Sequence, residues 1–273
     1  MKAQYSGILY EKEYMPLLHQ IHRTYTHRLG PGEMPGKRKD TERVYGILVP
    51  HSPYALAGPG MAWGYKLLSE HYFPETYVFL IPDTQGLYDK VMLVNESIET
   101  LFGVCSVDSA FADALLATTL VSSLKESSEF ALEIQIPFLQ EASRDRLKVL
   151  KIIPLIVPVC QNLPQLAEAL VKIKKDIVVI IASDLCGGSF VEDVDGSYFG
   201  YDKQLLRYIL HFDTEGFAHA LEKHKLSLLG EGALVLGMEI LKQLAVPQGE
   251  ILNYYNSSEM ASSEAKSFVS LVF

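Results

Sequence analysis

Residues 46–54 of the chain are Gly-Ile-Leu-Val-Pro-His-Ser-Pro-Tyr, and this stretch sets the interpretation of the whole sequence. Its apolar start has branched side chains at successive positions, which predicts a parallel strand buried between two layers of helices. His51 follows that strand directly and precedes Gly58-Pro59-Gly60. Because α/β sheets bind ligands beyond the carboxyl ends of their strands, His51 is a candidate site residue.

The rest of the chain alternates between β-rich runs and amphipathic segments. Strands are predicted at Val44–Val49, Tyr77–Ile81, Lys90–Val94, Val149–Val157, Ile177–Ala182, Ile251–Tyr255 and Ser267–Phe273. Helices are predicted at Tyr14–His27, Met61–His71, Ser109–Leu124, Leu163–Lys174, Asp202–Leu210, Glu215–Lys223 and Ala233–Leu244, with Asn162 and Asp213 as caps. This alternation predicts one α/β domain over residues 1–273, a layered sandwich with a largely parallel central sheet and helices on both faces.

The composition is that of a globular protein with an acidic surface. The chain has 273 residues, 48% of them hydrophobic, and a net charge of −9. Such a surface repels phosphate backbones, so no nucleic-acid partner is expected. No apolar stretch reaches the roughly 18–20 residues of a membrane span, and the amino terminus lacks the core of a signal peptide, so no membrane association is expected. The three cysteines show no paired spacing, which is typical of reduced thiols, and we expect a cytoplasmic protein.

Six segments form an ordered series of motifs. Residues 49–54, with Gly58-Pro59 shortly after, resemble the Pro-His-Ala-Gly-Tyr…Ser-Gly-Pro motif of the Memo family, also called protein B of the AmmeMemoRadiSam set. The other matching segments, in family order, are Ser6–Tyr10, Leu132–Leu139, Ile153–Val157, Ala182–Leu185 and Ser267–Phe273. The resemblance covers nearly the whole chain and implies the fold of the class III extradiol dioxygenases, with a pocket at the strand ends.

The resemblance also implies a metal site of two histidines and a cysteine, with an aspartate and another histidine nearby. His51 matches the first histidine and Asp184 matches the aspartate. At the other three positions Thr84 replaces the second histidine, Leu229 replaces the cysteine and Gly187 replaces the nearby histidine. In the segment that resembles His-Glu-His-Ser-Leu-Glu, both histidines are absent, while Glu129 and Glu133 remain.

These replacements predict a degenerate metal site. A transition metal needs about three ligands in a fixed arrangement, but Leu229 has no lone pair, Gly187 has no side chain and Thr84 offers only a neutral hydroxyl. We therefore expect no cofactor and a non-catalytic module that binds a peptide, a protein or a small molecule. In the family the pocket region is also associated with peptide partners. Tyr54 at the rim would anchor such a ligand, and Glu231, which opens a helix after Gly230, would repel an anion.

The sequence also supports an enzyme and a purely structural alternative. His51, Asp83 and Asp184 each follow a predicted strand, and one imidazole with two carboxylates could hold iron, manganese or magnesium. On this alternative the protein is a redox or hydrolytic enzyme with iron, manganese or copper at His51. A second form of the alternative is acid–base catalysis by His51 with Asp184. Alternatively, Asp83 opens a surface turn, Asp184 caps the turn at Gly187, and His51 is structural. In an assembly subunit without a ligand, Leu229 and Phe130 would fill the pocket.

Overall fold

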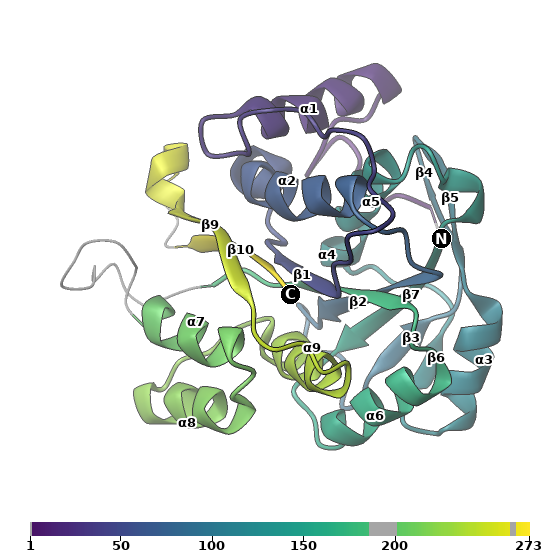
Figure 1. The fold of residues 1–273 in the computed structure, drawn as a ribbon, viewed down its shortest axis with the longest axis vertical. Coiled ribbons are helices and arrows are strands. Elements are labelled where there is room, and N and C mark those ends of the chain that lie inside the picture. The colour runs from purple at the N-terminus through teal and green to yellow at the C-terminus, as the bar shows by residue number, and fades with distance from the viewer. Residues whose placement is uncertain (1, 186–200, 263–265) are drawn as a thin grey trace.

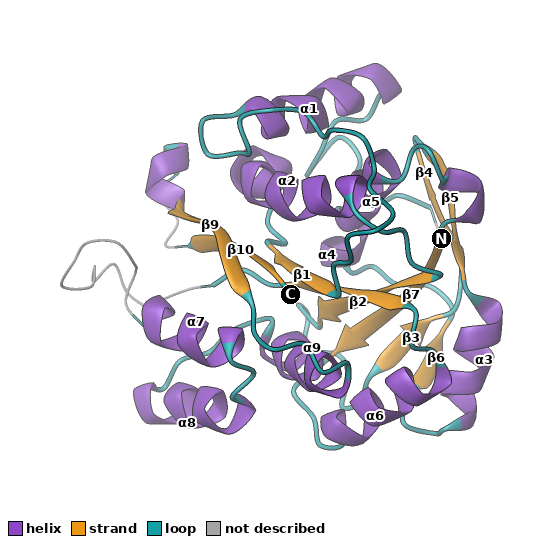
Figure 2. Cartoon of the chain, in the orientation of Figure 1, coloured by secondary structure: helices purple, strands orange, loops and turns teal. Residues whose placement is uncertain are grey.

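A ten-stranded sheet organises the residues that the computed structural model describes, which are 2–185, 201–262 and 266–273 (Figures 1 and 2). Its main path runs β4-β5-β7-β2-β8-β1-β10-β9, and β3 and β6 branch from β7. Along this path β5, β7, β2, β8 and β1 are mutually parallel, whereas β4, β10 and β9 pair antiparallel. The strands are β1 Gly46–Val49, β2 Thr76–Pro82, β3 Met92–Val94, β4 Ile98–Thr100, β5 Gly103–Val107, β6 Ser122–Leu124, β7 Lys151–Val157, β8 Ile177–Ala182, β9 Glu250–Asn256 and β10 Ser267–Val272.

Helices cover both faces of this sheet, as the sequence predicts (Figure 1). Within β1, Ile47 and Val49 pack into one hydrophobic core and Leu48 packs into the other, because successive side chains of a strand point to opposite faces. The first core lies under α1, α2 and α5, and the second lies under α3, α6 and α9. The helices are α1 Tyr14–Thr26, α2 Tyr54–Glu70, α3 Ser109–Ala117, α4 Phe130–Glu133, α5 Gln135–Ala142, α6 Leu163–Ile173, α7 Asp202–Leu210, α8 Thr214–His224 and α9 Glu231–Gln243, with short 3-10 turns at Leu147–Val149 and Ser257–Met260.

The predicted start of the second helix is wrong. The helix was predicted to begin at Met61, after Gly58-Pro59-Gly60, but it begins at Tyr54, so these three residues lie inside it. A Cβ on Gly58 would lie 2.6 Å from the Thr24 side chain, and a Cβ on Gly64 would lie 2.6 Å from Val49. The small residues therefore serve the close approach of α2 to α1 and β1, which a turn signal in the sequence cannot reveal.

Two further local predictions are wrong. The helix predicted over Ser109–Leu124 ends at Ala117, because Thr119 adopts a left-handed conformation with φ 63°, and the rest of the segment becomes β6. Asn162 makes no side-chain cap and has φ 68° itself. Asp213, in contrast, caps α8 as predicted, since its carboxylate accepts a 2.8 Å hydrogen bond from the Gly216 N–H.

Among the described segments, no helix combines the length and the apolar character that crossing a membrane would require. The sheet direction places the carboxyl ends of β1, β2, β7 and β8 at one edge. This is the edge at which the sequence predicts a site.

Candidate functional site

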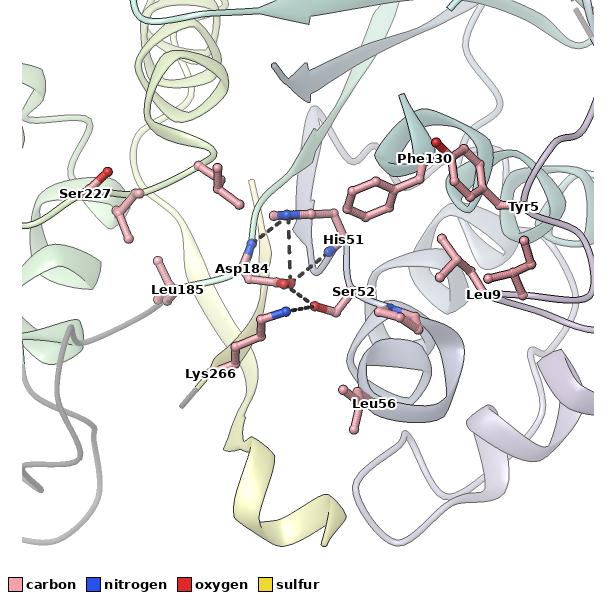
Figure 3. A pocket seen from close by; sticks show the side chains of 14 residues that line it. Tyr5, Leu9, His51, Ser52, Leu56, Phe130, Asp184, Leu185, Ser227 and Lys266 are labelled. Carbon is pink, nitrogen blue, oxygen red and sulfur yellow. Dashed lines mark hydrogen bonds and ion pairs between the residues drawn. The ribbon is translucent and has the colours of Figure 1, made fainter. Parts of the chain in front are cut away.

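A cavity of about 560 Å³ opens beyond the carboxyl ends of β1 and β8 (Figure 3). This volume is within the range of small-molecule sites, which is roughly 300–1,000 Å³. Six separate parts of the chain contribute its walls: the amino-terminal segment, the β1–α2 junction, α4, the residues after β8, the residues before α9, and the residue before β10. The lining residues are Tyr5, Ile8, Leu9, His51, Ser52, Pro53, Leu56, Phe130, Asp184, Leu185, Ser227, Leu228, Leu229 and Lys266.

His51 and Asp184 form a reciprocal pair at the floor of the cavity. The backbone N–H of His51 donates to Asp184 Oδ1 at 2.9 Å, and the backbone N–H of Asp184 donates to His51 Nδ1 at 3.0 Å. The two residues follow the adjacent parallel strands β1 and β8, which brings them together. The reciprocal bonds fix the orientation of the imidazole ring.

This pairing determines the tautomer of His51. A backbone N–H can only donate, so Nδ1 must be the acceptor and the neutral ring carries its proton on Nε2. Burial lowers the pKa of His51, and the nearby Asp184 carboxylate only partly opposes this effect. The ring is therefore neutral at pH 7 and presents an Nε2–H, for which the described residues provide no hydrogen-bond partner.

Ser52 and Lys266 complete the polar end of the cavity. The Ser52 hydroxyl donates to Asp184 Oδ2, and the Lys266 ammonium lies 3.4 Å from Ser52 Oγ. Figure 3 shows Lys266 and Asp184 each joined to the Ser52 hydroxyl by a dashed line. Both carboxylate oxygens of Asp184 thus already accept hydrogen bonds from the protein.

The other walls are apolar. The Phe130 ring lies 6.1 Å from the His51 ring and 6.0 Å from the Tyr5 ring, measured between centroids. Ile8 and Leu229, which are 74% and 60% exposed, stand at the solvent boundary of the cavity. Mostly apolar walls around a few polar groups are typical of small-molecule sites.

Comparison with known proteins identifies the family. A family model described as Memo-like protein matches residues 2–272. The chain belongs to this family. A MEMO1 family protein of Ignicoccus hospitalis is 30% identical over 268 residues, which cover 95% of this chain and 93% of the relative. Relatives with the same family name in Methanopyrus kandleri and Nitrosopumilus maritimus are 27% and 29% identical, covering 98% and 95% of this chain and 96% and 93% of their own lengths.

In this Memo-like protein, Thr84 and Glu129 satisfy each other outside the cavity lining. The Thr84 hydroxyl lies 2.8 Å from Glu129 Oε2 and 3.0 Å from Oε1, and its backbone N–H also donates to Oε2. The Gln85 amide adds a 3.4 Å contact to Glu129 Oε1. Burial raises the pKa of Glu129, although these hydrogen bonds lower it in part. The pair closes the loop after β2 onto the start of α4.

Glu133 holds the amino-terminal segment of the Memo-like chain. Its carboxylate is 1% exposed and accepts hydrogen bonds from the backbone N–H groups of Gln4 at 2.6 Å and Tyr5 at 2.8 Å, and from the Tyr10 hydroxyl at 2.7 Å. The segment so fixed supplies Tyr5, Ile8 and Leu9 to the cavity. Glu133 therefore shapes the cavity without lining it.

The predicted convergence of His51, Asp83 and Asp184 is not found. The Asp83 carboxylate accepts from the backbone N–H groups of Leu87 at 3.1 Å and Tyr88 at 2.8 Å, so it organises a turn and does not line the cavity. This is the alternative in which Asp83 opens a surface turn.

Tyr54 and Glu231 also lie outside the lining. Tyr54 is 2% exposed and its hydroxyl donates to the Ile134 carbonyl at 2.6 Å, so the prediction of a rim aromatic is wrong at this position. Glu231 is the first residue of α9, and burial raises its pKa. Gly187, together with Cys186, lies outside the described residues.

Several lining residues have no signal of their own in the sequence. Tyr5 supplies aromatic surface that Tyr54 was expected to supply, and Lys266 supplies the cation. Phe130, in contrast, was expected at the pocket from its place in the motif segment. Only the Ser6–Tyr10 motif pointed to the amino-terminal segment. Lys266 lies more than 200 positions from Ser52, so only the tertiary structure reveals their proximity.

Proposed function

We propose that this Memo-like protein is a non-catalytic binding module, whose strand-end cavity accepts a small molecule or a side chain of a peptide or protein partner without a resident transition metal. The observation that carries the proposal is the hydrogen bond from the Asp184 N–H to His51 Nδ1. Because Nδ1 accepts this hydrogen bond, the neutral ring carries its proton on Nε2, and Nε2 is a hydrogen-bond donor.

The described donor set does not fit a metal of the kind that the family resemblance implies. A histidine that binds a metal through Nε2 needs its lone pair there and usually donates its Nδ1–H to a neighbour, whereas this ring accepts at Nδ1. The carboxylate of Asp184 is held by His51 and Ser52, and Leu229 has no lone pair. In the described ranges, no group of three or more His, Cys, Asp and Glu side chains could hold a metal ion.

The walls support binding over a purely structural role. Leu229 and Phe130 line an open cavity and do not fill it, contrary to what an assembly subunit without a ligand requires. Mostly apolar walls with a few placed polar groups are the usual design of ligand sites. Exposed Ile8 and Leu229 at the opening would gain from coverage by a ligand.

Two measurements on the purified protein test the proposal. Elemental analysis should find iron, manganese and copper far below one ion per chain. N-phenyl-1-naphthylamine, a neutral apolar dye, should bind with a large gain of fluorescence. Leu56→Trp, which places a bulky ring in the cavity, should weaken dye binding about tenfold or more. The matched control is Val149→Trp, at an exposed site before β7.

Two outcomes would refute the binding module. One is nearly stoichiometric iron, manganese or copper that is lost in His51→Ala, which would establish the metal-dependent enzyme. The other is a dye that fails to bind, or that binds equally well to the wild type and to Leu56→Trp. A dye that responds equally to the two tryptophan variants would be binding elsewhere.

A further inference from the structure

We infer that the ligand of this cavity is an apolar molecule with a hydrogen-bond-accepting oxygen at one end, a medium-chain carboxylic acid or its neutral carbonyl derivative. The inference rests on the proposed function and adds the chemical class of the ligand. It follows from three features of the cavity: the hydrogen-bonding sense of its polar end, the charge at that end, and the apolar walls with the volume that they enclose.

The polar end offers a donor. His51 lines the cavity and presents Nε2–H, for which no described residue supplies an acceptor, so a ligand acceptor there would gain a hydrogen bond. The acceptors nearby are already used, because Asp184 accepts from His51 and Ser52. The Tyr5 hydroxyl donates to the Ser128 carbonyl at 2.8 Å. A ligand oxygen that accepts from His51 Nε2–H would therefore meet a donor for which the described residues supply no acceptor.

The charge at that end disfavours a cationic ligand. The Lys266 ammonium lies 3.4 Å from Ser52 Oγ, beside the floor of the cavity. A neutral carbonyl and a carboxylate are both compatible with this cation, whereas an ammonium head would face a like charge. A head group that can only donate would also meet His51 with the wrong hydrogen-bonding sense.

The body of the ligand must be apolar. Leu9, Leu56, Leu228 and Leu229 surround the space between the polar floor and the solvent, and Phe130 adds an aromatic wall. The volume of about 560 Å³ accommodates an extended aliphatic chain. Each methylene group that is buried there adds to the affinity, so a chain of about ten carbons gains enough to bind measurably.

Displacement of the bound dye tests the inference with three ten-carbon ligands: decanoate, methyl decanoate and decylamine. The two ligands with an acceptor oxygen should displace the dye, and decylamine should be about tenfold weaker. Comparing decanoate with methyl decanoate distinguishes a preference for the free acid from a preference for the neutral carbonyl. This series uses the wild-type protein and does not depend on a variant.

A matched pair of variants then tests the donor. In His51→Asn the amide oxygen can replace Nδ1 and accept from the Asp184 N–H, but no group reaches the position of Nε2. In His51→Gln the amide extends to that position. Decanoate should bind about 5-fold to 10-fold more weakly to the Asn variant, corrected for the dye affinity of each variant, and the Gln variant should recover most of this loss.

The outcomes separate this inference from the proposed function. The ligand class would be overturned if decylamine displaced the dye with the same affinity as decanoate. It would also be overturned if decanoate bound His51→Asn and the wild type equally. If the dye binds and none of the three ligands displaces it, the inference fails while the binding module stands. If the dye does not bind at all, the proposed function fails first.

Discussion

The two ends of the central sheet treat buried polar groups in opposite ways. Near the amino ends of β2 and β8, the buried Asp108 carboxylate accepts from the Thr76 hydroxyl at 2.6 Å, from the Lys174 ammonium at 2.8 Å and from the Phe111 N–H at 3.2 Å. At the carboxyl end, the His51–Asp184 pair leaves one ring N–H facing a cavity. A cluster whose hydrogen bonds are satisfied within the fold stabilises it, whereas a donor that lines a cavity, and for which no described residue supplies an acceptor, is suited to a ligand.

The pKa shifts follow the same division. Burial raises the pKa of Asp108, but the hydrogen bonds from Lys174 and Thr76 outweigh it and hold the value below the usual range. Burial lowers the pKa of His51, and Asp184 does not restore it. The amino end of the sheet therefore stabilises the charged Asp108 carboxylate by pairing it with Lys174, and the carboxyl end keeps the His51 ring uncharged.

The largest effect is expected for Lys174→Met. The substitution leaves the Asp108 carboxylate buried without its cation, and breaking such a pair costs about 2–3 kcal/mol when one partner is partly exposed. Urea unfolding at neutral pH measures the loss. Because the pKa of Asp108 is depressed in the folded state, the stability from this pair is lost as the pH falls below about 4. The difference between variant and wild type should therefore shrink in acid.

Lys172→Met, on the exposed face of α6, is the control for charge removal. It should change the free energy of unfolding by less than about 0.5 kcal/mol. If Lys174→Met also abolished dye binding in the folded protein, the two ends of the sheet would not be independent and the comparison would fail.

An intermediate effect on stability is expected for Glu133→Gln, because Glu133 holds the amino-terminal segment that lines the cavity. The three donors that meet this carboxylate cannot all be satisfied by an amide, so the variant should lose about 1–2 kcal/mol. The amino-terminal segment should loosen, weakening dye binding several-fold and exposing the Tyr5 and Leu9 bonds to chymotrypsin. Glu129→Gln is the matched control, since Glu129 binds the loop after β2. Equal proteolysis of the two variants would contradict this role of Glu133.

The strands of the sheet could be predicted from the sequence because each strand is recognised from the residues within its own segment. Branched apolar runs such as Ile177–Ala182 require burial on both faces, and the structure gives that strand the predicted bounds. His51 and Asp184 follow two such runs, so their common edge also followed from the pattern. The prediction of the start of α2 failed because it depends on packing. The small residues at Gly58 and Gly64 allow α2 to approach α1 and β1 closely, and the local sequence pattern does not report such contacts.

The cavity walls could not be predicted for the same reason. Tyr54, three residues after His51, suggested a rim aromatic, but as the first residue of α2 it turns toward Phe138 in the core. Tyr5 occupies the rim because Glu133 holds its backbone from a distant part of the chain. The direction of a side chain at a helix start and a contact across 128 positions are both tertiary properties.

The smallest effect is expected for the pH dependence of His51. Its pKa is lowered in the folded state, so below its ordinary value of 6.5 the unfolded chain takes up a proton that the folded chain refuses. Stability from the neutral ring is therefore present above that value and is lost as the pH falls. Wild type should lose more stability than His51→Gln between about pH 7.5 and about pH 5.5, because glutamine does not titrate. The other histidines contribute equally to both proteins. Parallel unfolding curves over this range would therefore mean that the folded chain accepts the proton at position 51 as readily as the unfolded chain does. The assignment of His51 Nδ1 as an acceptor, on which the proposed function rests, would then fail.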